Sequence, residues 1–139
     1  MITGAGGAFG KVLQDSGIAD IIGKEMSSLS IGLWLPFMAA AAIRAAQGSS
    51  TVAIITTASI LAPMLSSLGF DSSLGRALSV LAIGAGSMVA SHANDSFFWV
   101  VTQMSGMDVK TGYKLMTAGS ICLGVFACII IWITGMILL

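Results

Sequence analysis

The stretch Gln47-Gly48-Ser49-Ser50-Thr51 interrupts an apolar run that extends from Leu29 to Leu68. A helix rises about 1.5 Å per residue, so each flank of about seventeen residues would be roughly 26 Å long, close to the thickness of the hydrocarbon layer of a bilayer. The polar turn is therefore either a surface loop or the buried tip of a helical hairpin. The rest of the sequence has to be interpreted with these two alternatives in view.

The composition is that of an integral membrane protein. Of the 139 residues, 56% are hydrophobic and 9% are charged, and the mean hydropathy is +0.98, far from the values of soluble domains. The formal net charge is zero and the basic residues are scattered, which argues against a nucleic-acid-binding protein. One histidine and two separated cysteines give no metal-ligand spacing, so we expect neither a metal nor another cofactor.

We predict an all-α membrane protein with a single membrane domain over residues 1–139. A glycine-rich start and an interfacial amphipathic helix occupy residues 1–28, where charged residues alternate with apolar ones. The later segments are a helical hairpin at 29–68 with its tip at 47–51, a broken transmembrane helix at 74–104, a polar loop at 105–114, and a C-terminal transmembrane helix at 115–139. The hairpin either folds back as a re-entrant loop or spans the membrane twice, because loop charges do not distinguish these topologies.

Polar residues occupy the centre of segment 74–104, where an unbroken membrane helix would be apolar. The two polar stretches are Gly84-Ala85-Gly86-Ser87 and Ser91-His92-Ala93-Asn94-Asp95-Ser96. They predict a broken helix whose irregular backbone is buried in protein or lines a cavity. His92 and Asp95, three residues apart, would share a helical face, and either could exchange a proton. Alternatively, the break lies nearer the membrane surface and Asp95 caps the following helix.

The turn itself is a candidate site for an anionic group. Gly48 permits a tight reversal, and a helix that starts near Ser50 would direct its unpaired N–H groups and positive dipole end into the turn. Such an arrangement suits a carboxylate. The alternative is a plain surface turn with a serine cap. Arg44 is either a second contact for the anion or a side chain that extends to the membrane interface.

Three stretches of the sequence, in this order, resemble the C-terminal part of the gluconate permease family of bacterial symporters. They are GAGGAFGKVLQDSGI (4–18), RAAQGSSTVA (44–53) and SHANDSFFW (91–99). Members of this family take up gluconate and related sugar acids, some take up D-serine, and uptake is usually coupled to protons. Because members are much longer, the resemblance implies a C-terminal fragment of a carrier.

The resemblance also implies an architecture and a site. The chain would be one inverted-repeat half of an ion-transporter-type carrier, in which a re-entrant hairpin and a broken helix meet at the substrate. The substrate-binding residues would be Arg44, Gln47, Gly48, Ser49, Ser50, Thr51, Ser91, His92 and Asn94, and the proton-coupling residues would be Asp95 and His92. Ser49, Ser50 and Thr51 would be the hydrogen-bond donors to a carboxylate.

The expected location and partners of the chain are those of a bacterial carrier. The chain would be a multi-pass protein of the bacterial inner membrane, with a small organic acid, protons and the lipid bilayer as partners. It would need a missing N-terminal half, with homo-oligomerisation left open. We expect no enzyme, because no nucleophile is visibly paired with a base. The competing class is a small non-transporting assembly subunit that uses Gly6/Gly10 and Gly84/Gly86 as helix-contact faces. The sequence does not distinguish gluconate from other sugar acids or D-serine.

Overall fold

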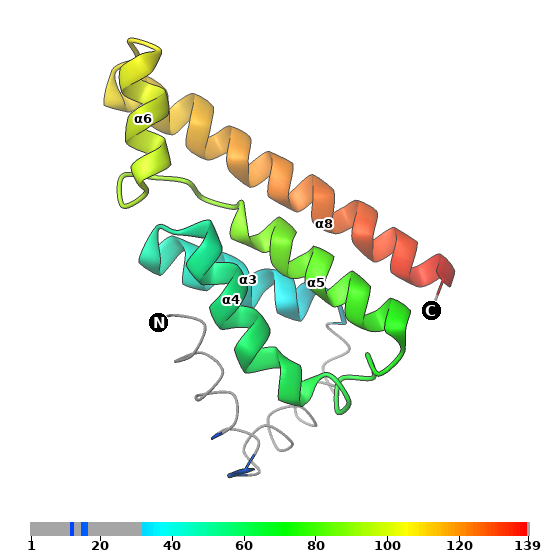
Figure 1. The fold of residues 1–139 in the computed structure, drawn as a ribbon. Coiled ribbons are helices and arrows are strands. Elements are labelled where there is room, and N and C mark those ends of the chain that lie inside the picture. Colours follow the sequence, from blue (N-terminus) through cyan, green and yellow to red (C-terminus); the bar gives the residue numbers. More distant parts are fainter. Residues whose placement is uncertain (1–11, 13–14, 17–31, 139) are drawn as a thin grey trace.

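A computed structural model describes residues 12, 15–16 and 32–138 of the chain (Figure 1). Every regular element in this part of the chain is helical, as predicted for an all-α protein. The predictions for residues 1–28, which include the interfacial helix and the Gly6/Gly10 contact, fall on a segment of which only residues 12, 15 and 16 are described.

Two helices flank the polar turn. Helix α3 spans Trp34–Gln47, and α4 spans Ser50–Leu61 and continues into the 3-10 turn η1, Ala62–Met64. Pro36 lies in the first turn of α3, where no intrahelical N–H is needed, and Pro63 lies in η1, where the α-helix has ended. The linker between α3 and α4 is shorter than the predicted tip at 47–51, because Gln47 still belongs to α3 and Ser50 already belongs to α4.

The broken segment consists of two helices separated by irregular backbone. Helix α5 spans Ser73–Ser87 and α6 spans Ser96–Met104. The prediction that Gly84-Ala85-Gly86-Ser87 belongs to the break is wrong, because α5 continues through these residues. The interruption extends from 88 to 95 and contains Ala90, which has a positive φ of 56°.

The final helical segment begins earlier than predicted. Helix α7 spans Val109–Gly112, a π-helical turn η2 spans Tyr113–Thr117, and α8 spans Ala118–Leu138. The predicted loop at 105–114 is therefore shorter, because Asp108 Oδ1 accepts a hydrogen bond from Thr111 N at 3.2 Å and so caps α7. Within the described residues, one helix is long and apolar enough to cross a membrane, and it spans Val109–Leu138. The multi-pass topology stays a prediction.

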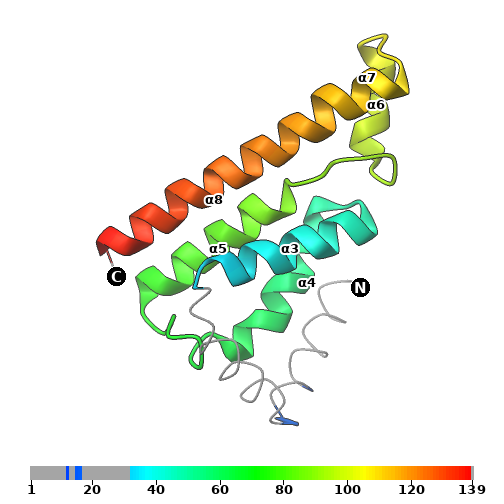
Figure 2. The same ribbon diagram turned by 180° about the vertical axis from the view of Figure 1, so that it is seen from behind.

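Helix α5 is central to the packing (Figures 1 and 2). It runs antiparallel to α8 on one side and packs against α3 and α4 on the other. Three buried apolar clusters join these helices. Their buried members are Ala40, Leu61, Met64 and Ile83; Phe37, Ala82, Ala85 and Cys128; and Leu33, Phe70 and Leu78. The packing fixes the C-terminal end of α3 near the C-terminal end of α5.

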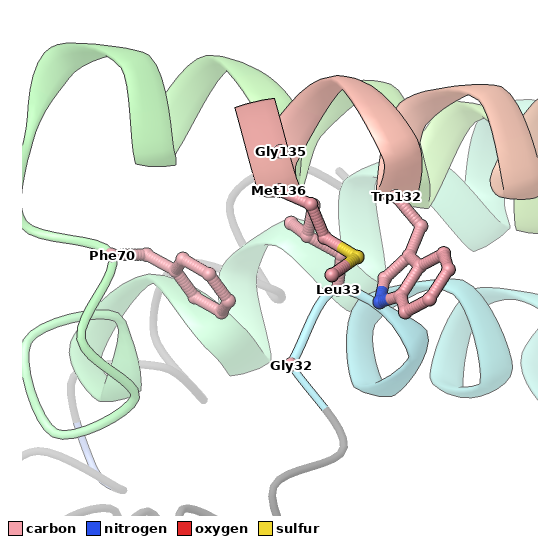
Figure 3. Close-up of a pocket in the computed structure, with 6 residues that line it drawn as sticks. All are labelled: Gly32, Leu33, Phe70, Trp132, Gly135 and Met136. Atoms are coloured by element: carbon pink, nitrogen blue, oxygen red, sulfur yellow. The ribbon is translucent and has the colours of Figure 1, made fainter. Parts of the chain in front are cut away.

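An apolar pocket lies at the opposite end of this bundle (Figure 3). It has a volume of about 300 Å³ and is formed where the start of α3 meets the last turns of α8. The residues that line it are Gly32, Leu33, Phe70, Trp132, Gly135 and Met136. It therefore shares no residue with the predicted site at the turn and the break.

Gly86 permits the close approach of α5 to α3. A Cβ atom at position 86 would lie 2.2 Å from the backbone oxygen of Phe37 and 2.9 Å from the Cβ atom of Ala40. Gly84, which was expected to contribute to the same contact face, has open space around the equivalent position. The two glycines therefore differ in what they do, although they lie two residues apart on one helix.

We predict that Gly86→Ala destabilises the protein, whereas Gly84→Ala does not. Both changes raise helix propensity, but only the first forces a backbone shift at α3, and such overpacking costs about 1–3 kcal/mol. Thermal unfolding of the detergent-solubilised protein measures the difference: the melting temperature of Gly86→Ala should fall below that of Gly84→Ala. Equal melting temperatures would contradict the close α3–α5 contact.

Candidate functional site

A buried ion pair joins the end of α3 to the irregular segment at 88–95. Arg44, in the last turn of α3, is 4% exposed and Asp95 is 5% exposed. Arg44 Nη2 donates to Asp95 Oδ2, and the hydroxyl of Ser91 donates to the same carboxylate oxygen. Arg44 Nη2 also lies 3.5 Å from Ser91 Oγ. Separating the two members of a buried pair is strongly destabilising, because each would be left as an uncompensated buried charge. The ion pair therefore holds α3 and the break together.

Asp95 has a second role in the same place. Its other oxygen, Oδ1, accepts a hydrogen bond from Phe97 N at 3.0 Å and caps α6. One alternative that the sequence left open was that Asp95 caps the following helix nearer the membrane surface. The structure shows the cap, and it also buries the other carboxylate oxygen against Arg44 and Ser91; the depth of Asp95 in the membrane stays a prediction. Its position is therefore fixed from the α3 side and from the α6 side.

The carbonyl of Ala45 accepts two hydrogen bonds from the break. Asn94 Nδ2 donates to it at 2.8 Å, and His92 Nε2 lies 3.2 Å from it. This oxygen is among the last carbonyls of α3, which have no partner within the helix. Because the carbonyl can only accept, the contact assigns the hydrogen of the His92 ring to Nε2, and Nδ1 lies 3.5 Å from Asn94 N as an acceptor. The break thus caps the C-terminus of α3.

His92 and Asp95 do not lie on one helical face, contrary to the sequence prediction. The backbone from 88 to 95 is not helical, so a spacing of three residues no longer brings the two side chains together. His92 contacts the Ala45 carbonyl, whereas Asp95 contacts Arg44. Both side chains still meet the same turn of α3, from different directions.

The turn between α3 and α4 approaches the break through Gly48. Gly48 has a φ of 72°, and its N–H donates to Arg44 O at 2.8 Å. A Cβ atom at this position would lie 2.2 Å from the backbone oxygen of Asn94. Glycine is thus required here for its left-handed conformation and also for the close contact.

The remaining residues of the predicted tip are more open. Ser49 Oγ accepts a hydrogen bond from Val52 N at 3.4 Å and caps α4. Ser49 and Ser50 are half-buried, and Gln47 and Thr51 are exposed. Within residues 32–138, no hydrogen bond links these four side chains to the break. The structure therefore brings Arg44, Gly48, Ser91, His92, Asn94 and Asp95 together, and places the other predicted residues beside this group.

Sequence reasoning missed residues of the last helical segment that contact the break, among them Thr117 and Ser120. Thr117 Oγ1 donates to Ser91 O at 2.6 Å, and Ser120 Oγ accepts from Ser91 N at 3.1 Å. Both are hydroxyl residues near the start of the long uncharged stretch at 115–139. Their polarity in an otherwise apolar helix was the available signal.

Comparison with known proteins identifies the family. The model of a family described as "GntP family permease" matches residues 1–137. This chain belongs to the GntP permease family. This result confirms the resemblance to the gluconate permease family that the sequence indicated. Because this is a family of permeases and transporters, the chain is not an enzyme, as predicted.

Curated relatives of this GntP family chain cover nearly all of it. It is 40% identical over 139 residues to "Gluconate permease" of Pseudomonas aeruginosa, a match that covers 99% of the chain and 30% of the relative. It is 40% identical over 134 residues to "Inner membrane permease YgbN" of Escherichia coli, covering 95% of the chain and 29% of the relative. It is 34% identical over 131 residues to "Low-affinity gluconate transporter" of Escherichia coli, covering 94% of the chain and 29% of the relative. The chain thus spans about 30% of the length of these relatives. No solved structure matches it.

We predict that Gly48→Ala weakens the contact between the turn and the break. Gly106→Ala is the matched control, because Gly106 has a similar φ of 65° but open space where a Cβ would lie. Both substitutions place alanine in a left-handed conformation, which costs about 1–2 kcal/mol. Gly48→Ala also pushes Asn94 away, so its melting temperature in detergent should fall further than that of Gly106→Ala. An equal fall would show that the close contact with Asn94 contributes nothing.

Proposed function

We propose that this chain forms part of a permease that carries gluconate or a related sugar acid, together with a proton, across the bacterial inner membrane. Family membership supports a transport function, and two of the relatives above are named for gluconate. Because the chain spans about 30% of their length, we propose that the substrate site is completed by the part of the carrier that this chain does not cover.

The buried Arg44–Asp95 pair carries this proposal. Ionisable groups at membrane depth are costly, and in transporters they are typical of substrate and proton pathways. Asp95 and Ser91 engage Arg44 through Nη2, while the buried Nε of Arg44 has no hydrogen-bond partner among the described residues. A guanidinium binds a carboxylate best through two parallel N–H groups. Arg44 therefore has unused capacity to bind a carboxylate.

Proton exchange at Asp95 would couple the two ligands. When Asp95 takes up a proton it loses its charge and its attraction for Arg44, and the guanidinium is left to bind the carboxylate of a sugar acid. When the sugar acid leaves, Asp95 ionises and pairs with Arg44 again. One proton and one carboxylate would thus bind together. In this scheme His92 and Asn94 orient the break, since both contact Ala45 O.

The turn would supply further donors to the same carboxylate. Helix α4 begins at Ser50, two residues after Gly48. Its first N–H groups and its positive dipole end therefore lie at the turn. The hydroxyls of Ser49, Ser50 and Thr51 lie in the same region and are at least partly exposed. We propose that the sugar acid binds between this helix end and Arg44.

The helix lengths support an arrangement of half-helices that meet inside the membrane. Helices α3, α4 and α5 have 14, 12 and 15 residues, whereas a full span needs about 20. A re-entrant hairpin facing a broken helix would place the turn and the break near the membrane centre. The competing class, an assembly subunit with Gly84/Gly86 as its contact face, has less support, because Gly86 is already occupied by α3.

We predict that Asp95→Asn strongly lowers proton-driven accumulation but preserves gluconate exchange. Asparagine keeps the shape of aspartate and can still cap α6, but it cannot ionise. Gluconate counterflow and uptake driven by a pH gradient should be measured in proteoliposomes that contain the complete carrier of which this chain is proposed to be a part. Accumulation should fall at least tenfold, whereas counterflow should remain measurable.

Asp71→Asn is the matched control for this prediction. Asp71 pairs with Arg76 at 3.6 Å, and its side chain is 63% exposed, so its loss should change neither assay. Accumulation by Asp95→Asn at the level of the unaltered protein would remove Asp95 from proton coupling. Absence of gluconate transport by the unaltered complete carrier would overturn the proposed function itself.

A further inference from the structure

The backbone of Ser91 is held at both of its hydrogen-bonding groups by the last helical segment. Its carbonyl accepts from Thr117 Oγ1 at 2.6 Å, and its N–H donates to Ser120 Oγ at 3.1 Å. Because the backbone is irregular here, these groups have no partner in a helix ladder. Unpaired backbone groups are costly away from water, so the two hydroxyls stabilise the break at this residue.

Thr117 differs from other helical hydroxyl residues of the chain. Ser59, Ser79, Thr102 and Thr134 each donate to the carbonyl four residues earlier in their own helix, at 2.8–2.9 Å. Thr117 instead reaches across to another segment, 26 residues away in sequence. It ends the π-helical turn η2, and π-helical turns occur frequently at functional sites.

Ser120 completes the arrangement. Its hydroxyl donates to Thr117 O at 2.9 Å, which leaves its oxygen lone pairs for the N–H of Ser91. The residue before Ser91 is Ala90, whose positive φ of 56° is unfavourable for a residue with a side chain. The two hydrogen bonds at Ser91 oppose relaxation of this strained backbone.

We propose that Thr117 and Ser120 are positioning residues of the transport site. This proposal rests on the function proposed above and adds residues outside the turn and the break. They hold the Ser91 backbone so that its hydroxyl donates to Asp95 and lies against Arg44. Neither touches the substrate; they act through Ser91. Without them, Ser91 would move away from Asp95, and Arg44 would be presented less accurately to a carboxylate.

Thr117→Val tests this proposal, because valine keeps the shape of threonine and removes the hydroxyl. We expect the KM for gluconate to rise five- to tenfold at an unchanged amount of protein in the membrane. Thr117→Ser, which restores the hydroxyl, should return KM to within twofold of its original value. Thr134→Val is the matched control on the same helix, since it removes an ordinary intrahelical bond. A change in KM for Thr117→Val no larger than for Thr134→Val would overturn the proposal.

A second measurement does not depend on transport. Ala93→Cys, in a background with Cys122→Ser and Cys128→Ala, reports the accessibility of the break to a maleimide. Thr117→Val should raise the labelling rate at least threefold, whereas Thr117→Ser and Thr134→Val should leave it unchanged. If the unaltered complete carrier did not transport gluconate, the proposed function would fail, and the labelling rate would still decide whether Thr117 holds the break. Equal labelling of Thr117→Val and Thr134→Val would then overturn the inference.

Discussion

A charged guanidinium buried at the end of α3 is the constraint on which this part of the structure depends. Arg44 is 4% exposed, and a charge in such a position needs a counter-charge and hydrogen bonds. Asp95 provides the counter-charge from the irregular segment that follows α5. It can reach Arg44 because the chain is not helical between Ser87 and Ser96. The ion pair and the broken helix therefore depend on each other.

The break also makes hydrogen bonds with three elements that surround it, and some of these satisfy its irregular backbone. The Ala45 carbonyl of α3 accepts from the side chains of the break. Trp99 Nε1 of α6 donates to Ala93 O at 2.8 Å, and the start of α8 holds Ser91. A movement of the break would change contacts with all three elements, and the transport function proposed above requires linked changes of this kind to expose a site to alternate sides.

The sequence predicted the features that depend on local pattern. The polar stretch Ser91–Ser96 located the break, and the long uncharged stretch located the helix that is long and apolar enough to cross a membrane. The three resembling stretches indicated the family. It did not predict the Arg44–Asp95 pair, because these residues are 51 positions apart and meet through the close α3–α5 packing at Gly86. It also placed His92 and Asp95 on one face, since helical periodicity fails inside a break. Thr117 and Ser120 were missed because a hydroxyl in a helix usually bonds to its own backbone.

A double-mutant cycle on Arg44 and Asp95 measures how strongly the buried ion pair couples α3 to the break. The free energy of unfolding would be measured by SDS titration in mixed micelles for Arg44→Met, Asp95→Asn and the double variant. Each single change should cost about 3–5 kcal/mol, because it leaves its partner buried without a counter-charge. The double variant should lose less than the sum of the single losses, by at least about 1 kcal/mol. Single losses that add to within about 0.5 kcal/mol would show that the two side chains are not coupled and would contradict the buried ion pair.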